Sequence, residues 1–476
     1  MHEADLVANT VNKWLGNPIS RRFLRWIARR EGGSSKLEKA LKKYAGEDVE
    51  LSFQEKFAYL LTKLFIEKGA ESFDISKEDV KKAMKESVVR RALVNILEGI
   101  GYYGVQRPQT TAAPFLIVWD YTNACNLRCK HCYADAKPNP APDELTTQEA
   151  KRAIDEFEEA NVVALAFSGG EPLMRKDFFE VAKYAKERGF YISVATNGTL
   201  INKQTAKKLR ETVDYVEISL DGFEKTHDEF RGVPGAWRLA VRGIKNCVEE
   251  GIDTGVATTI TRYNFKEIPK LLEFVENELH AKRFIAFNYV PTRRGKDIVE
   301  KDISPQKRKE LLELLYSKLV TSCPLDTFST APQYSVVAAE YVEGPAVATH
   351  FTNKQAIELL KGRTKTLTEF IGGCGAGRLY CGMEPNGDIQ PCVFIPIKIG
   401  NIREERLLDI WHNSPILKLI RDRDSFEGCG TCDYEYICGG CRARAYGYFG
   451  DLRGPDPGCW VKPEYWERIK KINRKV

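Results

Sequence analysis

Three cysteines in the first third of the chain have the spacing of a metal-binding motif. Cys125, Cys129 and Cys132 lie in the run CNLRCKHC, a C-x3-C-x2-C pattern. The sequence shows no export signal, and in a reducing compartment thiols stay free to bind metal. Because a 4Fe-4S cluster has four irons, three thiolates leave one iron without a protein ligand. The motif predicts an iron–sulfur centre with one iron open to a small molecule.

The cysteine run follows an apolar stretch, residues 115–122, that predicts a β-strand. In α/β folds, ligand sites lie at the carboxyl ends of the strands. The alternative is a structural zinc site made by the same cysteines and His131. Zinc knuckles rarely follow such a strand, so the cluster is favoured.

Short polar and glycine runs end the next predicted strands and complete a resemblance. The runs are SGGEP at 168–172, TNG at 196–198 and SLDG at 219–222. Together with the cysteine motif they resemble the radical SAM superfamily over about residues 113–300. In that family the open iron binds S-adenosylmethionine (SAM), which is split to a 5'-deoxyadenosyl radical that removes hydrogen from unactivated carbon.

The resemblance implies that Cys125, Cys129 and Cys132 are the catalytic cluster ligands. It also implies a set of SAM-binding residues: Tyr133, Gly169, Gly170, Glu171, Asn197, Ser219 and Arg231. A strand-end cap for Ser219 and a surface ion pair for Arg231 are the alternatives. His227 and Asp228 are expected to be structural.

Eight further cysteines are grouped near the C-terminus. They are Cys374, Cys381, Cys392, Cys429, Cys432, Cys438, Cys441 and Cys459. With Gly387 five residues before Cys392, the pattern resembles the SPASM extension of radical SAM enzymes, although Cys438 and Cys441 enclose two residues where the family usually has three.

The SPASM resemblance implies two auxiliary 4Fe-4S clusters, hence three clusters in all. One would be held by Cys374, Cys381, Cys392 and Cys441, and the other by Cys429, Cys432, Cys438 and Cys459. Two four-cysteine zinc sites, or one cluster with a mononuclear iron, are the alternatives. Sulfatase-maturing relatives carry an aspartate after the cysteine equivalent to Cys392, whereas Val393 and Phe394 follow it here, which disfavours that oxidation.

The elements that must position these residues alternate strictly. Predicted strands cover 115–122, 162–168, 191–196, 215–220, 254–260 and 283–290, and predicted helices cover 146–160, 177–188, 202–213, 236–250 and 265–280. This alternation predicts a parallel sheet, and the motifs favour a partial (β/α)6 TIM-like barrel over a doubly wound sheet. We expect a helical N-terminal domain at 1–105, the barrel at 113–300, a helical connector at 301–370 and a cysteine-rich iron–sulfur domain at 371–476.

The N-terminal region gives the only indication of a substrate. Its helix around residues 20–30 carries Ile19, Phe23, Trp26 and Ile27 on one face and arginines on another. Packing within its own domain is one interpretation, and contact with an anionic membrane surface is the other. The absence of an apolar run long enough to span a membrane predicts a cytoplasmic protein, or one peripheral at the inner membrane surface.

We therefore expect a radical SAM enzyme served by a low-potential donor such as ferredoxin or flavodoxin. The predicted substrate is a lipid or other long hydrocarbon, with C–C bond formation on an archaeal-type membrane lipid as the specific hypothesis. A peptide or cofactor precursor is the first alternative, and an iron–sulfur electron-transfer protein without SAM chemistry is the second. No nucleic-acid partner is expected, because no aromatic and basic platform recurs.

Overall fold

One ten-stranded sheet runs through the computed structural model, which describes residues 12–31, 33–72, 75–321, 323–341, 346–347 and 367–472. Its strand order is β12-β11-β10-β3-β4-β5-β6-β7-β8-β9. From β10 through β3 to β9 every neighbouring pair is parallel. The carboxyl ends of these strands therefore meet at one edge, where the sequence places its motifs.

The six predicted strands and the five helices between them are present. The strands are β3 (Leu116–Thr122), β4 (Ala164–Gly169), β5 (Tyr191–Thr196), β6 (Tyr215–Ser219), β7 (Thr254–Ile260) and β8 (Arg283–Asn288). The helices are α7 (Thr147–Glu159), α8 (Phe178–Glu187), α9 (Lys203–Thr212), α11 (Ala236–Glu249) and α12 (Ile268–Asn277). Thr146 and Glu149 form a capping box at the start of α7. The α/β fold with a parallel sheet is confirmed.

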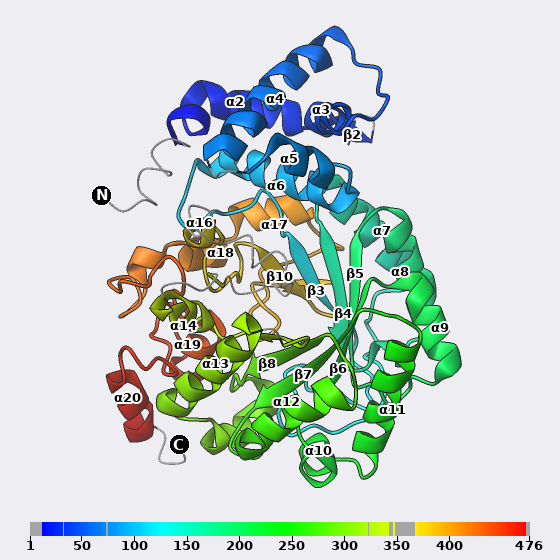
Figure 1. Cartoon of the computed structure of the whole chain (residues 1–476), viewed down its shortest axis with the longest axis vertical. Helices are drawn as coiled ribbons and strands as arrows, with labels where there is room; N and C mark the ends of the chain where they lie inside the picture. The colour runs from blue at the N-terminus through cyan, green and yellow to red at the C-terminus, as the bar shows by residue number, and fades with distance from the viewer. Residues whose placement is uncertain are drawn as a thin grey trace.

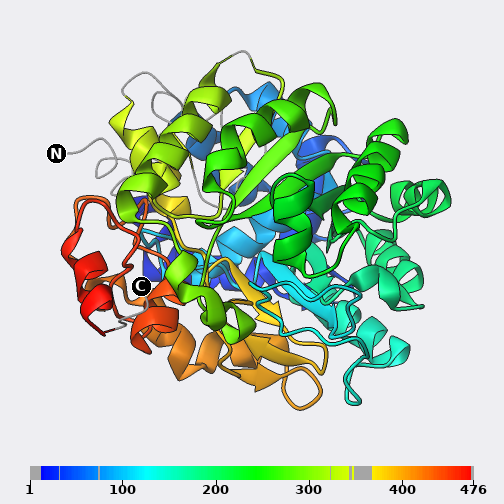
Figure 2. The ribbon, with the colours of Figure 1, turned by 90° about the horizontal axis from the view of Figure 1, so that it is seen from below.

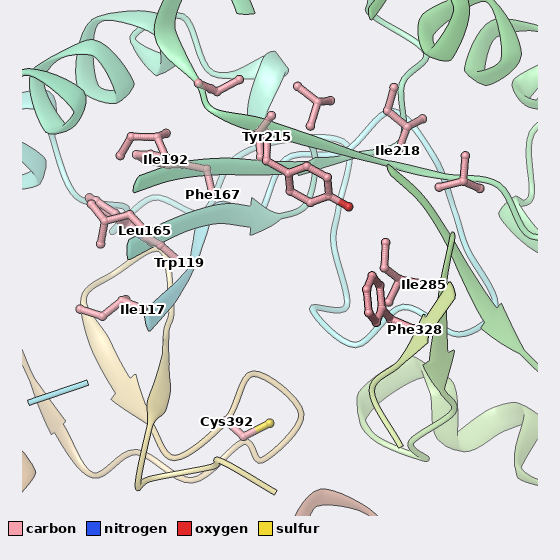
Figure 3. Packing of buried hydrophobic residues seen from close by; sticks show 14 of the residues in the cluster. Ile117, Trp119, Leu165, Phe167, Ile192, Tyr215, Ile218, Ile285, Phe328 and Cys392 are labelled. Atoms are coloured by element: carbon pink, nitrogen blue, oxygen red, sulfur yellow. The ribbon is translucent and has the colours of Figure 1, made fainter. Parts of the chain in front are cut away.

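The sheet is curved and covered by helices on its outer side (Figures 1 and 2). Trp119 on β3 packs edge-on against Phe157 of α7, and Tyr121 against Phe178 of α8. Figure 3 shows Ile117 and Trp119 of β3 near Leu165 and Phe167 of β4. Because side chains alternate along a strand, the neighbours of Trp119 and Tyr121 on β3 face the inside of the barrel.

A further parallel strand, β9 (Asp326–Ser329), lies within the region predicted as a helical connector. It pairs with β8, and Figure 3 shows Phe328 beside Ile285. Its sequence DTFS has no apolar run, so periodicity does not reveal it. The helices around it are α13 (Pro305–Val320) and α14 (Tyr334–Glu340), and residues 348–366 of the connector lie outside the described residues.

The cysteine-rich C-terminal region extends the same sheet. Its strands are β10 (Tyr380–Met383), β11 (Asp388–Gln390) and β12 (Gly400–Asn401), and its α-helices are α16 (Leu367–Ile371), α17 (Leu407–Asn413), α18 (Pro415–Arg421), α19 (Arg442–Phe449) and α20 (Glu464–Ile472). β10 pairs in parallel with β3. This pairing joins the cysteine-rich C-terminal region to the strand that precedes Cys125. The four-part division of the chain remains a prediction.

The described residues of the N-terminal region form helices and one pair of two-residue strands, β1 (Arg30–Glu31) and β2 (Ser34–Ser35). Its helices are α2 (Pro18–Ala28), α3 (Lys36–Ala45), α4 (Phe53–Ser72), α5 (Lys77–Ala83) and α6 (Ser87–Tyr103). A short break at residues 84–86 separates α5 from α6. Asn95 of α6 donates to the backbone oxygens of Ala113 and Asn161 and so ties this region to the barrel.

The apolar residues of the amphipathic helix α2 do not all lie on one buried face. Leu24 and Ile27 are buried, whereas Ile19 is 82% exposed and Trp26 37% exposed. Phe23 lies between these extremes and contacts Phe57 of α4 at a ring-centroid distance of 6.1 Å. The internal-packing interpretation therefore accounts for Leu24 and Ile27 but not for the exposed residues.

Helix α4 continues this exposed apolar surface. Phe53, Phe57, Leu60 and Leu64, called here the α4 stripe, are 88%, 52%, 63% and 42% exposed. Their spacing of four, three and four residues places them on one face of the helix. Among the described residues no helix is long and apolar enough to cross a membrane.

Candidate active site and iron–sulfur centres

The loop after β3 holds the three motif cysteines against one small apolar cluster, with Cys125 and Cys129 buried and Cys132 partly buried. Cys125 and Cys129 are each 8% exposed, and Cys132 packs against the same small apolar cluster. Burial, followed by nearby charges that include the other two thiols, raises the pKa of Cys125 to about 12. A bound metal would reverse this, because metal binding deprotonates a thiol. Three sulfur donors on one loop at a strand end fit an iron–sulfur cluster with one open iron.

Gly169 and Gly170 allow the second strand end to pack directly on the cysteine loop. A Cβ at Gly170 would lie 2.1 Å from the Ala124 carbonyl oxygen, and one at Gly169 would lie 2.7 Å from that of Thr122. Gly169 also has a φ of 108°, which favours glycine. Any side chain at these positions would push the loop of Cys125 away from β4.

Glu171 braces the site from within. Its carboxylate is fully buried and accepts hydrogen bonds from Thr196 Oγ1 at 2.7 Å, Asn197 N at 2.8 Å and Leu173 N at 3.2 Å. These bonds join the end of β4 to the end of β5. The carboxylate is therefore committed to holding the strand ends together.

Asn197 connects the end of β5 to the cysteine loop. Its Nδ2 donates to Asn126 Oδ1 at 2.8 Å and lies 3.9 Å from Cys125 Sγ. Asn126 in turn donates to Thr199 Oγ1 at 2.8 Å. Asn126 and Thr199 are supporting residues that sequence reasoning missed, although Asn126 lies inside the CNLRCKHC run and Thr199 directly follows the TNG run.

Arg231 is not a surface side chain, which corrects the alternative proposed for it. It is buried at the end of α10 (Glu224–Arg231), its Nε donates to Asp221 Oδ2 at 2.6 Å, and its Nη1 lies 3.6 Å from Cys129 Sγ. The cation is placed to stabilise a thiolate in the cluster motif. Ser219, at the carboxyl end of β6, is partly buried.

His227 and Asp228 hold backbone rather than line the site. His227 Nδ1 accepts from the Asp221 amide at 3.0 Å, and Asp228 accepts from the Gly235 and Trp237 amides. His131 stacks on Phe230 at 4.1 Å, with its Nε2 4.0 Å from Asp221 Oδ2. This orientation gives the zinc alternative no support.

Tyr133 faces the barrel interior beside an acidic group that the sequence analysis missed. Its hydroxyl lies 2.9 Å from Asp120 Oδ1 and 2.6 Å from Ser168 Oγ. Burial, followed by the nearby charge of Glu384, raises the pKa of Asp120 to about 8 despite the lowering effects of Tyr133 and Arg293. Asp120 is thus a carboxyl group that holds its proton near neutral pH inside the barrel.

The C-terminal cysteines fall into two groups. Cys429, Cys432, Cys438 and Cys459 together line one hollow, whose wall also includes Gly440 and Asp456. A Cβ at Gly440 would lie 2.9 Å from Cys429 Sγ, so glycine keeps this wall open. The four members of this group are those assigned to one cluster from the sequence.

The second group contains Cys374, Cys392 and Cys441. Burial and then the charge of Cys374 raise the pKa of the Cys441 thiol, with a further contribution from Cys392. These sulfurs therefore share one environment. Cys381, assigned to the same cluster from the sequence, is fully buried, and burial is the one cause that raises the pKa of its thiol, so it does not share this environment.

In the described part of the chain, no three Cys, His, Asp or Glu side chains converge as the ligands of a single metal ion would. The larger 4Fe-4S cluster spreads its thiolates over its corners and does not require such convergence. The donor set and the four-cysteine hollow fit such clusters.

Comparison with known proteins agrees with this geometry. The radical SAM superfamily model matches residues 119–275, and the SPASM model, an iron-sulfur cluster-binding domain, matches residues 374–433. The AdoMet-dependent heme synthase of Methanosarcina barkeri is 35% identical over 356 residues, which cover 74% of this chain and 98% of the relative. The chain belongs to the radical SAM superfamily.

Two further proteins place this radical SAM/SPASM enzyme more fully. The Fe-coproporphyrin III synthase of Methanosarcina barkeri is 32% identical over 374 residues, covering 73% of this chain and 88% of the relative. SuiB of Streptococcus suis, solved with SAM bound, has a TM-score of 0.61 and 17% identity over 89% of this chain and 92% of its own. The SuiB likeness concerns the fold alone.

A buried charge network fixes the SPASM region of this radical SAM enzyme onto the barrel. Arg444 of α19 pairs with Asp302 at 2.9 Å and Asp456 at 3.0 Å, and its Nη1 donates to the Tyr289 carbonyl at 2.6 Å. Asp456 also accepts from the Cys441 amide at 2.9 Å. Cys441 belongs to one group of C-terminal cysteines, and Asp456 lies in the wall of the hollow formed by the other group. The network therefore holds both groups at fixed positions relative to β8.

The two singleton cysteines lie away from these sites. Cys247 is fully buried in α11. Cys323 lies just after α13, where its sulfur is 3.2 Å from Glu276 Oε1.

Proposed function

We propose that this radical SAM enzyme removes hydrogen from a carbon atom of a cofactor precursor, with a tetrapyrrole that carries carboxylate side chains as the first candidate class. The observation that carries this proposal is the similarity to an AdoMet-dependent heme synthase across 98% of that protein's length. The hypothesis of C–C bond formation on a membrane lipid receives no comparable support from the relatives described above.

When bound and reduced, the cluster and SAM would supply the 5'-deoxyadenosyl radical. Cys125, Cys129 and Cys132 would hold that cluster, and the SAM-contacting set would be Tyr133, Gly169, Gly170, Asn197 and Ser219. The role of Glu171 would be to brace this set, and that of Arg231 to stabilise the thiolate of Cys129.

The interior beside Tyr133 suits an anionic substrate. Arg293 follows β8 and pairs with Glu384, and its charge acts on Asp120 across the barrel. A substrate carboxylate could replace Glu384 as the partner of Arg293, since guanidinium groups bind carboxylates in a two-pronged manner. Asp120, protonated near neutral pH, could donate to or accept from the same group.

Electrons would come from a low-potential donor such as ferredoxin or flavodoxin. The SPASM region would hold two auxiliary clusters beside the barrel. Their proposed role is to pass on the electron left when hydrogen removal makes a substrate radical.

The test is incubation of the reconstituted enzyme with SAM, dithionite and iron coproporphyrin III. The proposal expects deoxyadenosine above the substrate-free level and a mass change confined to the tetrapyrrole side chains. Parallel arms would contain an isoprenoid lipid and a cysteine-free peptide. Stimulation by the lipid or the peptide alone would overturn the tetrapyrrole assignment and favour that substrate class.

We also propose that the N-terminal region attaches reversibly to an anionic membrane surface. The α4 stripe with Ile19 and Trp26 is an exposed apolar surface, and exposed lysines such as Lys56 and Lys63 lie on the same helix. Such a helix lies in the plane of a membrane interface. Attachment of this kind does not require a lipid substrate.

A further inference from the structure

The register of β10 against β3 decides which face of the sheet each β10 side chain occupies. Tyr380 aligns with Leu116, Cys381 with Ile117, and Met383 with Trp119. Aligned residues of neighbouring parallel strands point to the same side. Cys381 therefore shares the outer, helix-covered side with Ile117 and Trp119, and Tyr380 points toward the barrel interior.

The surroundings of Cys381 agree with this direction. It is fully buried, and burial is the one cause that raises the pKa of its thiol, whereas the charges of Cys374 and Cys392 also raise the pKa of Cys441. Figure 3 shows Cys392 lying away from Ile117, on the loop that follows β11. Cys381 is therefore not placed to join the group of Cys374, Cys392 and Cys441.

Tyr380 occupies the place beside these three cysteines. Its hydroxyl donates to Cys392 Sγ at 2.8 Å. Burial and then the charges of Cys392 and Cys374 raise the pKa of the phenol, and Cys441 also contributes. The three sulfurs and the phenol oxygen thus share one pocket.

A one-residue slip of β10 would be needed to bring Cys381 into that pocket, and Gly382 opposes it. A Cβ at Gly382 would lie 2.8 Å from the Val393 nitrogen. A one-residue slip reverses the direction of every side chain in the strand. It would put either Cys381 or Met383 in the place of Gly382, with a side chain pressed against the Val393 backbone. The register is fixed by this close contact.

We propose that the first auxiliary cluster is a three-cysteine centre, held by Cys374, Cys392 and Cys441, with Cys381 as a core residue and the Tyr380 phenol beside the fourth iron. An iron without a cysteine ligand can take an exchangeable oxygen donor, such as water or a carboxylate. The proposal rests on the iron–sulfur assignment within the proposed function and is independent of the substrate.

The test uses full-length protein in which Cys125, Cys129 and Cys132 are all replaced by alanine, so that only auxiliary clusters remain. After anaerobic reconstitution we expect about eight irons per chain, two clusters of four. Cys381→Ala should keep this iron content, as should Cys247→Ala, the matched control for removing a buried core thiol. Cys392→Ala should lose about four irons, one cluster.

Mild ferricyanide treatment, followed by electron paramagnetic resonance, then tests whether one iron of the first auxiliary cluster lacks a cysteine ligand. An iron that lacks a cysteine ligand leaves as Fe²⁺ while ferricyanide takes up one electron, which gives a paramagnetic 3Fe-4S cluster. We expect about one such cluster per chain, and expect Tyr380→Cys, which adds a fourth thiolate, to suppress it at least fivefold.

The outcomes separate this proposal from the one on which it rests. Loss of about four irons in Cys381→Ala but not in Cys247→Ala would overturn the three-cysteine centre while leaving the iron–sulfur enzyme intact. A 3Fe-4S signal unaffected by Tyr380→Cys would remove Tyr380 from the open corner. Stoichiometric zinc in place of iron would contradict the proposed function itself.

Discussion

The rings of Tyr133 and Phe394 lie 5.0 Å apart, so the residue after Cys132 contacts a residue two positions beyond Cys392. Tyr133 belongs to the radical SAM loop, and Phe394 belongs to the SPASM region. This contact joins the loop of the catalytic cluster to that of the first auxiliary cluster. The two cysteine sites therefore approach each other at this contact.

Phe394→Ala should separate SAM cleavage from substrate turnover. The ring lies between the two sites, so its removal should misplace the substrate without disturbing Cys125, Cys129 and Cys132. We expect product formation to fall at least about tenfold, equivalent to ~1.4 kcal/mol of activation free energy. Deoxyadenosine formed without substrate should change less than about twofold. Equal losses in both assays would show that Phe394 supports the catalytic cluster instead.

Glu171→Gln should destabilise the protein, because the new amide would present a donor to groups that are themselves donors. We expect the free energy of unfolding to fall by about 2 kcal/mol and SAM binding to weaken. Urea unfolding measures the first effect. Glu180→Gln is the matched control at an exposed position of α8 and should change stability by less than about 0.5 kcal/mol. Indistinguishable midpoints for the two variants would refute the bracing role.

Asp120 should make stability depend on pH. Its folded pKa of about 8 lies above the ordinary value of 3.8, so the folded state keeps a proton that the unfolded state loses. Between these two values stability should fall as pH rises, by up to about 1.4 kcal/mol per pH unit. Unfolding measured from pH 5 to pH 8 should show a flatter profile for Asp120→Asn, and an unchanged profile for Asp143→Asn at an exposed position. Parallel profiles for wild type and Asp120→Asn would contradict this assignment.

The strand boundaries and the three motif cysteines could be predicted from the sequence, because buried parallel strands are continuous apolar runs and the cysteine spacing is local. Tyr380 and Asp120 could not, since their roles depend on which face of the sheet they occupy. That face is set by pairing between β3 and β10, which lie more than 250 residues apart. For the same reason the sequence assigned Cys381 to a cluster by spacing, whereas the register places it in the core.

The α4 stripe predicts binding to anionic vesicles that weakens with added salt. Phe57→Glu combined with Leu60→Glu should reduce co-sedimentation at least fivefold, because the stripe would lose its apolar centre and gain negative charge. Leu239→Glu, which adds a charge at an exposed leucine of α11, should pellet like the wild type. Negligible pelleting of all three proteins would remove the membrane proposal.

The central claim is that the Cys125, Cys129 and Cys132 site cleaves SAM. The direct measurement is deoxyadenosine formed anaerobically from SAM and dithionite by the reconstituted wild type and by a variant with alanine at all three cysteines. We predict formation by the wild type and a loss of at least a hundredfold in the variant, with the auxiliary iron of about eight atoms per chain retained. Unchanged deoxyadenosine formation by the variant would contradict the account.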